Sequence, residues 1–216
     1  KVYLAPYAPN GKPLQVQGFL KAFEKAASFN GQSLLNLQQY RIPLVGLDPA
    51  MTLVYRQEYA KTLQAGKAPL VMLAQEWLID ALPKSEAVKE DEPYHFLPHC
   101  TEKTNEPGSI GQWQSIFQRV GLTLQVQASG CCGMSGTYGH ETRNARTSDT
   151  IYGQSWKRLI HTFNQSGRVV ADGYSCRSQV KRQEGVTVLH PLQVLLARVK
   201  EGSVASRFAI EPELSP

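Results

Sequence analysis

The sequence lacks several features that would identify common classes of protein. It has no secretory signal peptide and no apolar run of transmembrane length, so we expect neither export nor a membrane span. Its net charge of +5 comes from scattered basic residues, without the basic stripe or aromatic platform that a nucleic-acid partner requires. It also lacks the C-x-x-C pair that is typical of zinc sites and dithiol redox proteins.

What the sequence does have is the composition of a globular protein. Hydrophobic residues make up 42% of the 216 positions and charged residues 19%, which is enough to bury one large core or two small ones. The chain opens with Lys1-Val2-Tyr3-Leu4, which is typical of a strand already under way. We therefore expect the chain to be cut from an upstream partner.

Cysteine is scarce, and its placement is the most informative feature of the chain. Two of the four cysteines, Cys131 and Cys132, are adjacent in a run with four glycines, from Gly130 to His140. The other two, Cys100 and Cys176, lie far away on either side. Neighbouring side chains diverge in extended backbone, so the pair suits two irons of one cluster better than a single ion. Glycine amides can also point at an anionic cluster.

Three other interpretations of the cysteines stay open at this point. They could be buried small hydrophobic residues, because free cysteine is commonly buried. They could bind a structural zinc ion, although adjacent cysteines are poorly spaced for one. They could also form a redox-active dithiol without metal.

The segment Cys131-Cys132-Gly133-Met134-Ser135-Gly136 resembles the core of the cysteine-rich CCG domain. This domain occurs in heterodisulfide reductases and in iron–sulfur subunits of glycolate oxidase and anaerobic glycerol-3-phosphate dehydrogenase. The thirty residues between Cys100 and Cys131 fit the family pattern, whereas the forty-three between Cys132 and Cys176 exceed its usual second gap. Gln179 stands where the family has a fifth cysteine, which favours a conventional four-iron cubane over the unusual five-cysteine cluster.

Further motifs narrow this resemblance. The segments around Cys100 and Cys176, together with His190-Pro191-Leu192-Gln193, are similar to the C-terminal ends of large bacterial FAD-linked oxidoreductases. That group includes enzymes of the D-2-hydroxyglutarate and D-lactate dehydrogenase type. The resemblance is strongest from about Glu92 to Val199.

The resemblance implies a site and its cofactors. It implies a 4Fe-4S cluster held by Cys100, Cys131, Cys132 and Cys176, and FAD in a part of the protein outside this chain. The cluster would relay electrons from the flavin to a quinone or another carrier, so no catalytic residue is expected here and this chain alone should not oxidise the hydroxy acid. The residues expected to surround the cluster are His99, Gly133, Gly136, Tyr138, His140, Tyr174 and Gln179.

The expected partners are the flavin and ferredoxin-like modules of the same polypeptide and an electron acceptor, with homo-oligomerisation left open. We expect a cytoplasmic protein, with peripheral attachment at the inner face of the membrane as an alternative. Two other functions also stay open. One is a cluster that itself reduces thiols or disulfides, and the other is a structural metal-binding scaffold.

Strand and helix patterns alternate along the chain and predict an α/β fold. We interpret it as two pseudo-repeated Rossmann-like βα halves with mainly parallel sheets, because parallel crossovers need covering helices. We expect residues 1–88 to form a cysteine-free, degenerate CCG-like half whose first βα unit is missing upstream. Residues 89–200 are expected to form the CCG half that carries the cluster site, and 201–216 a C-terminal tail. In such a sheet, loops at the carboxyl ends of the strands converge, which would bring the four thiols together.

Overall fold

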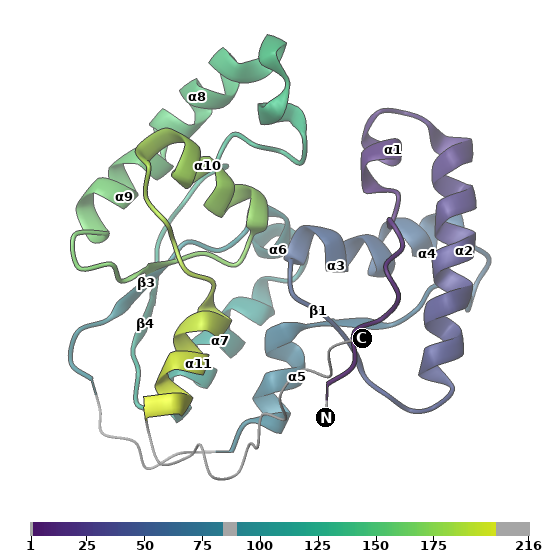
Figure 1. Ribbon diagram of the computed structural model, residues 1–216, viewed down its shortest axis with the longest axis horizontal. Helices are drawn as coiled ribbons and strands as arrows, with labels where there is room; N and C mark the ends of the chain where they lie inside the picture. The colour runs from purple at the N-terminus through teal and green to yellow at the C-terminus, as the bar shows by residue number, and fades with distance from the viewer. Residues whose placement is uncertain (1, 84–89, 202–216) are drawn as a thin grey trace, which may run out of the picture.

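The computed structural model describes residues 2–83 and 90–201 (Figure 1). In the cysteine-free half, helices cover a small two-stranded sheet. Asp48 and Pro49 are residue types that favour a helix start, and Asp48 is the N-cap of helix α3, with Pro49 at the first position. The Asp48 side chain accepts a hydrogen bond from the Met51 backbone N–H. The elements are α1 (Lys12–Val16), α2 (Leu20–Gln38), β1 (Leu44–Gly46), α3 (Pro49–Arg56), α4 (Glu58–Thr62), β2 (Val71–Leu73) and α5 (Ala74–Ala81).

The cysteine-bearing half contains a three-stranded sheet between two layers of helices. Its elements are β3 (Tyr94–Phe96), α6 (Cys100–Asn105), α7 (Pro107–Arg119), β4 (Leu124–Val126), the 3₁₀ turns η1 (Tyr138–His140) and η2 (Thr142–Asn144), α8 (Ala145–Gln154), α9 (Trp156–Phe163), β5 (Val169–Val170), α10 (Tyr174–Glu184) and α11 (Pro191–Glu201). The α/β prediction is thereby confirmed.

Both sheets are parallel. Strand β1 pairs with β2, and β3 lies between β4 and β5 in the order β4-β3-β5. Phe96 of the central strand lies opposite Val126 and Val170, so the three strands end at the same edge. The chain leaves each of them there toward a cysteine.

Two apolar cores cover the two faces of the three-stranded sheet. Val169 packs in one core and Val170 in the other, because successive residues of a strand point to opposite faces. Helices α8, α9 and α10 pack on the first face, and α7 and α11 on the second (Figure 1). Helix α5 of the cysteine-free half adds Ala74 to the second core, so the two halves share apolar packing.

Two local predictions are wrong. Val2–Pro6 does not form a strand: Val2 and Leu4 are almost fully exposed, so this segment has no apolar burial to offset the entropy of ordering it. The apolar residues from Tyr152 to Phe163 recur at helical spacing and predict one continuous helix, but the helix is broken at Ser155, whose φ is −139°. The Ser155 hydroxyl accepts a hydrogen bond from the Gly130 N–H at 2.7 Å instead.

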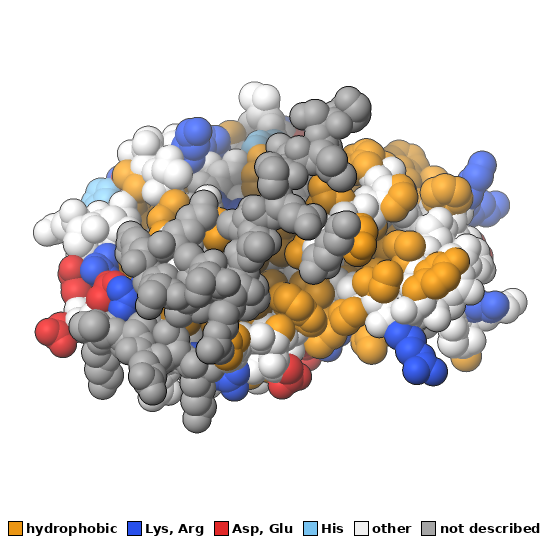
Figure 2. Space-filling model, turned by 60° about the horizontal axis from the view of Figure 1, so that its bottom comes forward, with side chains coloured by type: hydrophobic (Ala, Val, Ile, Leu, Met, Phe, Trp, Pro, Cys, Tyr) orange, Lys and Arg blue, Asp and Glu red, His pale blue; other side chains and the backbone are white. Residues whose placement is uncertain are grey.

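Many large apolar side chains of the cysteine-free half are exposed, and Figure 2 shows such side chains gathered on one face of the molecule.

Among residues 2–83 and 90–201, no helix combines the length and apolar character needed to cross a bilayer. The polar segment 83–93, rich in Glu and Lys, predicts a linker between the halves. Its residues 84–89, and residues 202–216 of the predicted tail, lie outside the described residues.

Candidate metal centre

Three loops at one edge of the sheet carry the four cysteines. Cys100 begins α6 shortly after β3, Cys131 and Cys132 lie in the loop that follows β4, and Cys176 is in the first turn of α10 after β5. Strands that are neighbours in a parallel sheet deliver their following loops to the same place. The cysteines therefore meet although 76 positions separate the first from the last.

The thiols contact one another in a chain. The sulfur of Cys131 is hydrogen-bonded with the thiols of Cys100 and Cys132, and Cys132 is also hydrogen-bonded with Cys176. Cys132 and Cys176 are only 3% and 1% exposed, whereas Cys100 and Cys131 are half-buried. All four are free cysteines. Because they contact one another, the four sulfurs form one group, which is buried at Cys132 and Cys176 and partly exposed at Cys100 and Cys131.

The hydrogen bonds distribute protons unevenly within this group. The Cys100 and Cys132 thiols donate to the Cys131 sulfur and lower the pKa of Cys131, with help from the Gly133 N–H at 3.3 Å. The same contact with Cys131, together with burial, raises the pKa of Cys100 and of Cys132. Cys131 therefore loses its proton more readily than Cys100 or Cys132, and metal ligands are thiolates.

The donor set is chemically suited to an iron–sulfur cluster. Within the described ranges, no group of three or more His, Cys, Asp or Glu side chains is arranged to hold a single metal ion. Four thiols from three loops are the natural ligand set of a multi-iron cluster. The N–H that Gly133 directs at the Cys131 sulfur is the kind of donor that stabilises bound thiolates.

Gly133 is required by its surroundings. Its φ is +88°, and a Cβ built there would lie 2.3 Å from the backbone oxygen of Ser148. Only glycine allows α8 to pack this closely behind the vicinal cysteines. Gly136 also has a positive φ, +68°, but a Cβ there would have no neighbour within 4 Å.

His99 links two of the cysteine loops. Its backbone N–H donates to Asp172 Oδ1 at 2.9 Å, which connects the loop of Cys100 to the loop that leads to Cys176. Its ring caps α6 through Nδ1, which accepts from the Thr101 N–H at 3.1 Å. A Cβ on Gly173 would lie 2.3 Å from the ring, so that glycine makes room for it.

Asp172 is a buried carboxylate that the sequence analysis does not single out. It directly follows the apolar residues of β5, and a polar residue at the end of a buried strand is the signal that could have found it. Among the described residues, no hydrogen-bond partner reaches its second oxygen, Oδ2, or Oε2 of Glu102, and the two carboxyl groups interact electrostatically with each other. Burial and the neighbouring Asp172 raise the pKa of Glu102 to about 10, so the Glu102 carboxyl group holds a proton at neutral pH.

The other residues predicted around the site lie in varied positions. Tyr174 follows the third loop, but its side chain is 68% exposed and its backbone N–H donates to Asp48. Gln179 is buried, yet its amide contacts Ser148 and Arg182 of the α8–α10 packing. His140 is exposed, and Tyr138 opens the turn η1.

Two cations border the site. The Arg177 guanidinium donates to the backbone oxygens of Ala171 and Asp172 at 2.9 and 2.7 Å, and the Lys103 ammonium donates to the backbone oxygen of Ser129. Both side chains thus brace a cysteine loop, and the Arg177 charge also interacts with the Cys176 sulfur. Such charge offsets part of the negative charge of four thiolates.

Comparison with known proteins gives strong matches to dehydrogenases. The chain is 55% identical over 196 residues to D-2-hydroxyglutarate dehydrogenase of Pseudomonas putida, and 44% identical over 199 residues to that of Escherichia coli. Each match covers 91% of this chain and 19% of the relative, so the chain spans about a fifth of the length of these enzymes.

A weaker match extends the relationship. The chain is 27% identical over 193 residues to one subunit of the anaerobic glycerol-3-phosphate dehydrogenase of Escherichia coli, covering 86% of this chain and 48% of that subunit. No protein-family model and no solved structure matches the chain. The chain is thus homologous to the C-terminal fifth of D-2-hydroxyglutarate dehydrogenases and related to this glycerol-3-phosphate dehydrogenase subunit.

Proposed function

We propose that this chain is the iron–sulfur electron-transfer module of a FAD-linked D-2-hydroxy acid dehydrogenase of the D-2-hydroxyglutarate type. The observation that carries the proposal is the contact of four thiols from three separate loops at one edge of a parallel sheet. Cys100, Cys131, Cys132 and Cys176 would hold a 4Fe-4S cluster. When bound, that cluster would accept and donate single electrons between a flavin and a quinone or other carrier.

The chain's own residues prepare this site. Cys131 supplies a thiolate, whereas Cys100 and Cys132 would release their protons when metal binds. Burial of Cys132 and Cys176 keeps water from that side of the site, and the half-buried Cys100 and Cys131 mark the side that an electron partner can approach.

In this proposal only one of the two halves binds the cluster. Residues 89–200 carry the cluster, and the cysteine-free half, residues 1–88, would be a degenerate copy. In that half Asp48 follows β1 at the place where the vicinal cysteines follow β4. The oxidation of the hydroxy acid itself is assigned to a flavin module outside this chain.

Anaerobic reconstitution with iron and sulfide tests the proposal. We expect about four irons per chain and a paramagnetic resonance signal after one-electron reduction. The variant Cys132→Ser should bind less iron and lose the native signal. Unchanged iron content in this variant, or zinc in place of iron in protein purified without oxygen, would refute the proposal.

A further inference from the structure

We propose that Gln75 of the cysteine-free half is a positioning residue for the thiol site, because its buried amide holds helix α6, which Cys100 begins. The inference rests on the proposed function. It gives the half that has no cysteine a specific part in the chemistry of the half that has all four.

The first contact lies inside the protein. Gln75, the second residue of α5, is 2% exposed, and its Nε2 donates to Glu102 Oε1 at 2.5 Å. Glu102 is 0% exposed and lies two residues after Cys100 on α6. Water cannot replace a donor at a fully buried oxygen. Loss of the Gln75 amide would therefore remove the hydrogen bond by which the cysteine-free half holds Glu102 Oε1.

Through further contacts, Glu102 connects Gln75 to two of the cysteine loops. Its Oε1 also accepts from the Ser109 hydroxyl at 2.6 Å, and its carboxyl group interacts with that of Asp172. Asp172 in turn accepts the backbone N–H of His99, the residue directly before Cys100. The path from Gln75 therefore ends at the backbone of one cysteine loop and in the loop that leads to Cys176.

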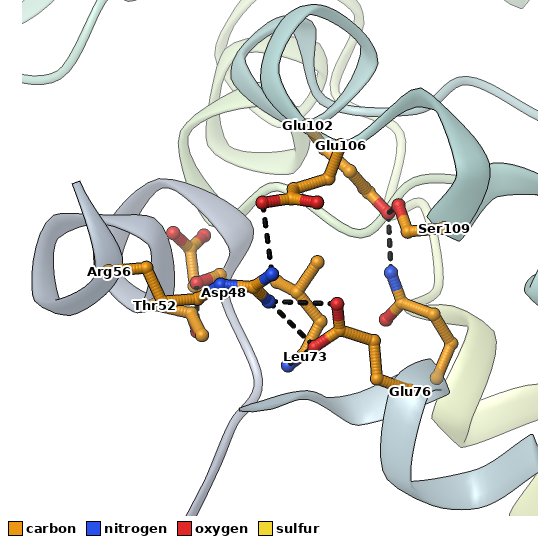
Figure 3. Close-up of polar contacts among 9 residues, drawn as sticks. Asp48, Thr52, Arg56, Leu73, Glu76, Glu102, Glu106 and Ser109 are labelled. Carbon is orange, nitrogen blue, oxygen red and sulfur yellow. Dashed lines mark hydrogen bonds and ion pairs between the residues drawn. The ribbon is translucent and has the colours of Figure 1, made fainter. Parts of the chain in front are cut away.

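A second contact holds the other end of α6. Arg56 of α3 pairs with Glu76 of α5 at 2.7 Å and with Glu106, which ends α6, at 2.9 Å (Figure 3). Glu76 also accepts from the Leu73 N–H, which fixes its carboxylate at the start of α5. The cysteine-free half thus contacts α6 through a buried hydrogen bond at Glu102 and through a partly exposed ion pair at Glu106.

The consequence for the thiols follows from the geometry. The Cys100 thiol donates to Cys131, so a shift of α6 changes the distance between these two sulfurs. Replacing a residue that orients a metal ligand without contacting the metal typically lowers metal affinity by about 10–100-fold. Gln75 is expected to act in this way, through Glu102, without contacting the sulfurs.

The test compares reconstituted variants of the whole chain. Gln75→Leu removes the donor, whereas Glu102→Gln keeps an oxygen for Gln75 and Ser109 and an amide for Asp172. Gln32→Leu is the matched control, because Gln32 is an exposed amide of the same half that bonds only to Asn36 among its described contacts. Three quantities are measured for each: the rate of iron loss to a chelator, the midpoint potential, and the paramagnetic resonance spectrum.

We expect Gln75→Leu to lose iron about tenfold faster or more, with a shifted potential and an altered spectrum. Glu102→Gln and Gln32→Leu should match the unchanged chain. The inference is overturned if Gln75→Leu has the native potential and spectrum, even if it is less stable, because Gln75 then only holds the halves together.

A second Gln75 variant and a cysteine variant complete the test. Should Gln75→Leu fail to fold, Gln75→Asn, whose amide is one methylene too short to reach Glu102, takes its place with the same expected and contrary results. Cys132→Ser is measured in parallel. If that variant keeps its iron, the proposed function fails; if it loses iron while both Gln75 variants are native, only the role of Gln75 fails.

Discussion

The backbone N–H of His99 donates to the carboxylate of Asp172 across 2.9 Å, although 73 positions separate the two residues. This hydrogen bond joins the loop after β3 to the loop after β5, and a cysteine follows each. Asp172 is 1% exposed, so no solvent competes for the bond. The convergence of the cysteines therefore depends on a residue that is not a ligand.

Replacing Asp172 should loosen the site. Asp172→Ala leaves the His99 N–H buried without an acceptor, which we expect to cost about 1–3 kcal/mol of unfolding free energy. Urea unfolding of the metal-free chain measures this. Asp172→Asn keeps an acceptor for His99 and is the control; an Asp172→Ala chain as stable as Asp172→Asn would show that the hydrogen bond contributes nothing.

Gly133 should tolerate no side chain. Gly133→Ala places a Cβ 2.3 Å from the Ser148 backbone oxygen at a φ of +88°, so strain and steric overlap should together destabilise the chain by about 2 kcal/mol or more. Gly136→Ala shares the positive φ but meets no neighbour, and should cost about 1 kcal/mol. Equal midpoints of thermal unfolding for the two variants would contradict the packing seen around Gly133.

The raised pKa of Glu102 predicts a pH dependence of stability. The pKa of Glu102 is raised to about 10 in the folded chain, so the folded state holds a proton that the unfolded state releases above its ordinary pKa of about 4.3. Glu102 should therefore stabilise the fold fully at low pH, and this contribution should decline as pH rises toward 10. Glu102→Gln should flatten that decline in urea titrations between pH 5 and pH 9; an unchanged slope would mean that Glu102 is ionised in the fold.

Ser155 should support the vicinal cysteines from behind. Its hydroxyl accepts from the Gly130 N–H, and the neighbouring Trp156 Nε1 donates to the Gly130 oxygen at 3.0 Å. Ser155→Ala frees the Gly130 N–H and should cost about 1 kcal/mol. Faster hydrogen exchange at Gly130, detected by mass spectrometry of peptides across 128–134, is the expected result, and native protection there would argue against this support.

Periodicity and turn chemistry made much of the fold predictable. Strands β1 to β5 lie in short apolar runs that are followed by polar loops. Helix α3 begins at Asp48-Pro49, because Asp is a favourable N-cap and Pro is favourable at the first helical position. The meeting of the cysteine loops followed from the parallel topology alone. These are features that neighbouring residues determine, so a single sequence contains them.

The polar residues beneath the thiols could not be found in the same way. Glu102 and Gln75 look like surface residues in the sequence, because nothing local shows that α5 and α6 bury them against each other. Whether an acidic residue is ionised in solvent or holds a proton in the core depends on which distant side chain faces it. The break at Ser155 has a similar cause, since the hydrogen bond that favours it comes from Gly130, twenty-five positions away.

The most direct test of the central claim is a crystal structure of the anaerobically reconstituted chain, with anomalous scattering recorded at the iron edge. We predict one iron–sulfur cluster at the edge of the β4-β3-β5 sheet, bonded to the sulfurs of Cys100, Cys131, Cys132 and Cys176. Iron at another place, or at these loops with Cys100 or Cys176 unbound, would contradict the account.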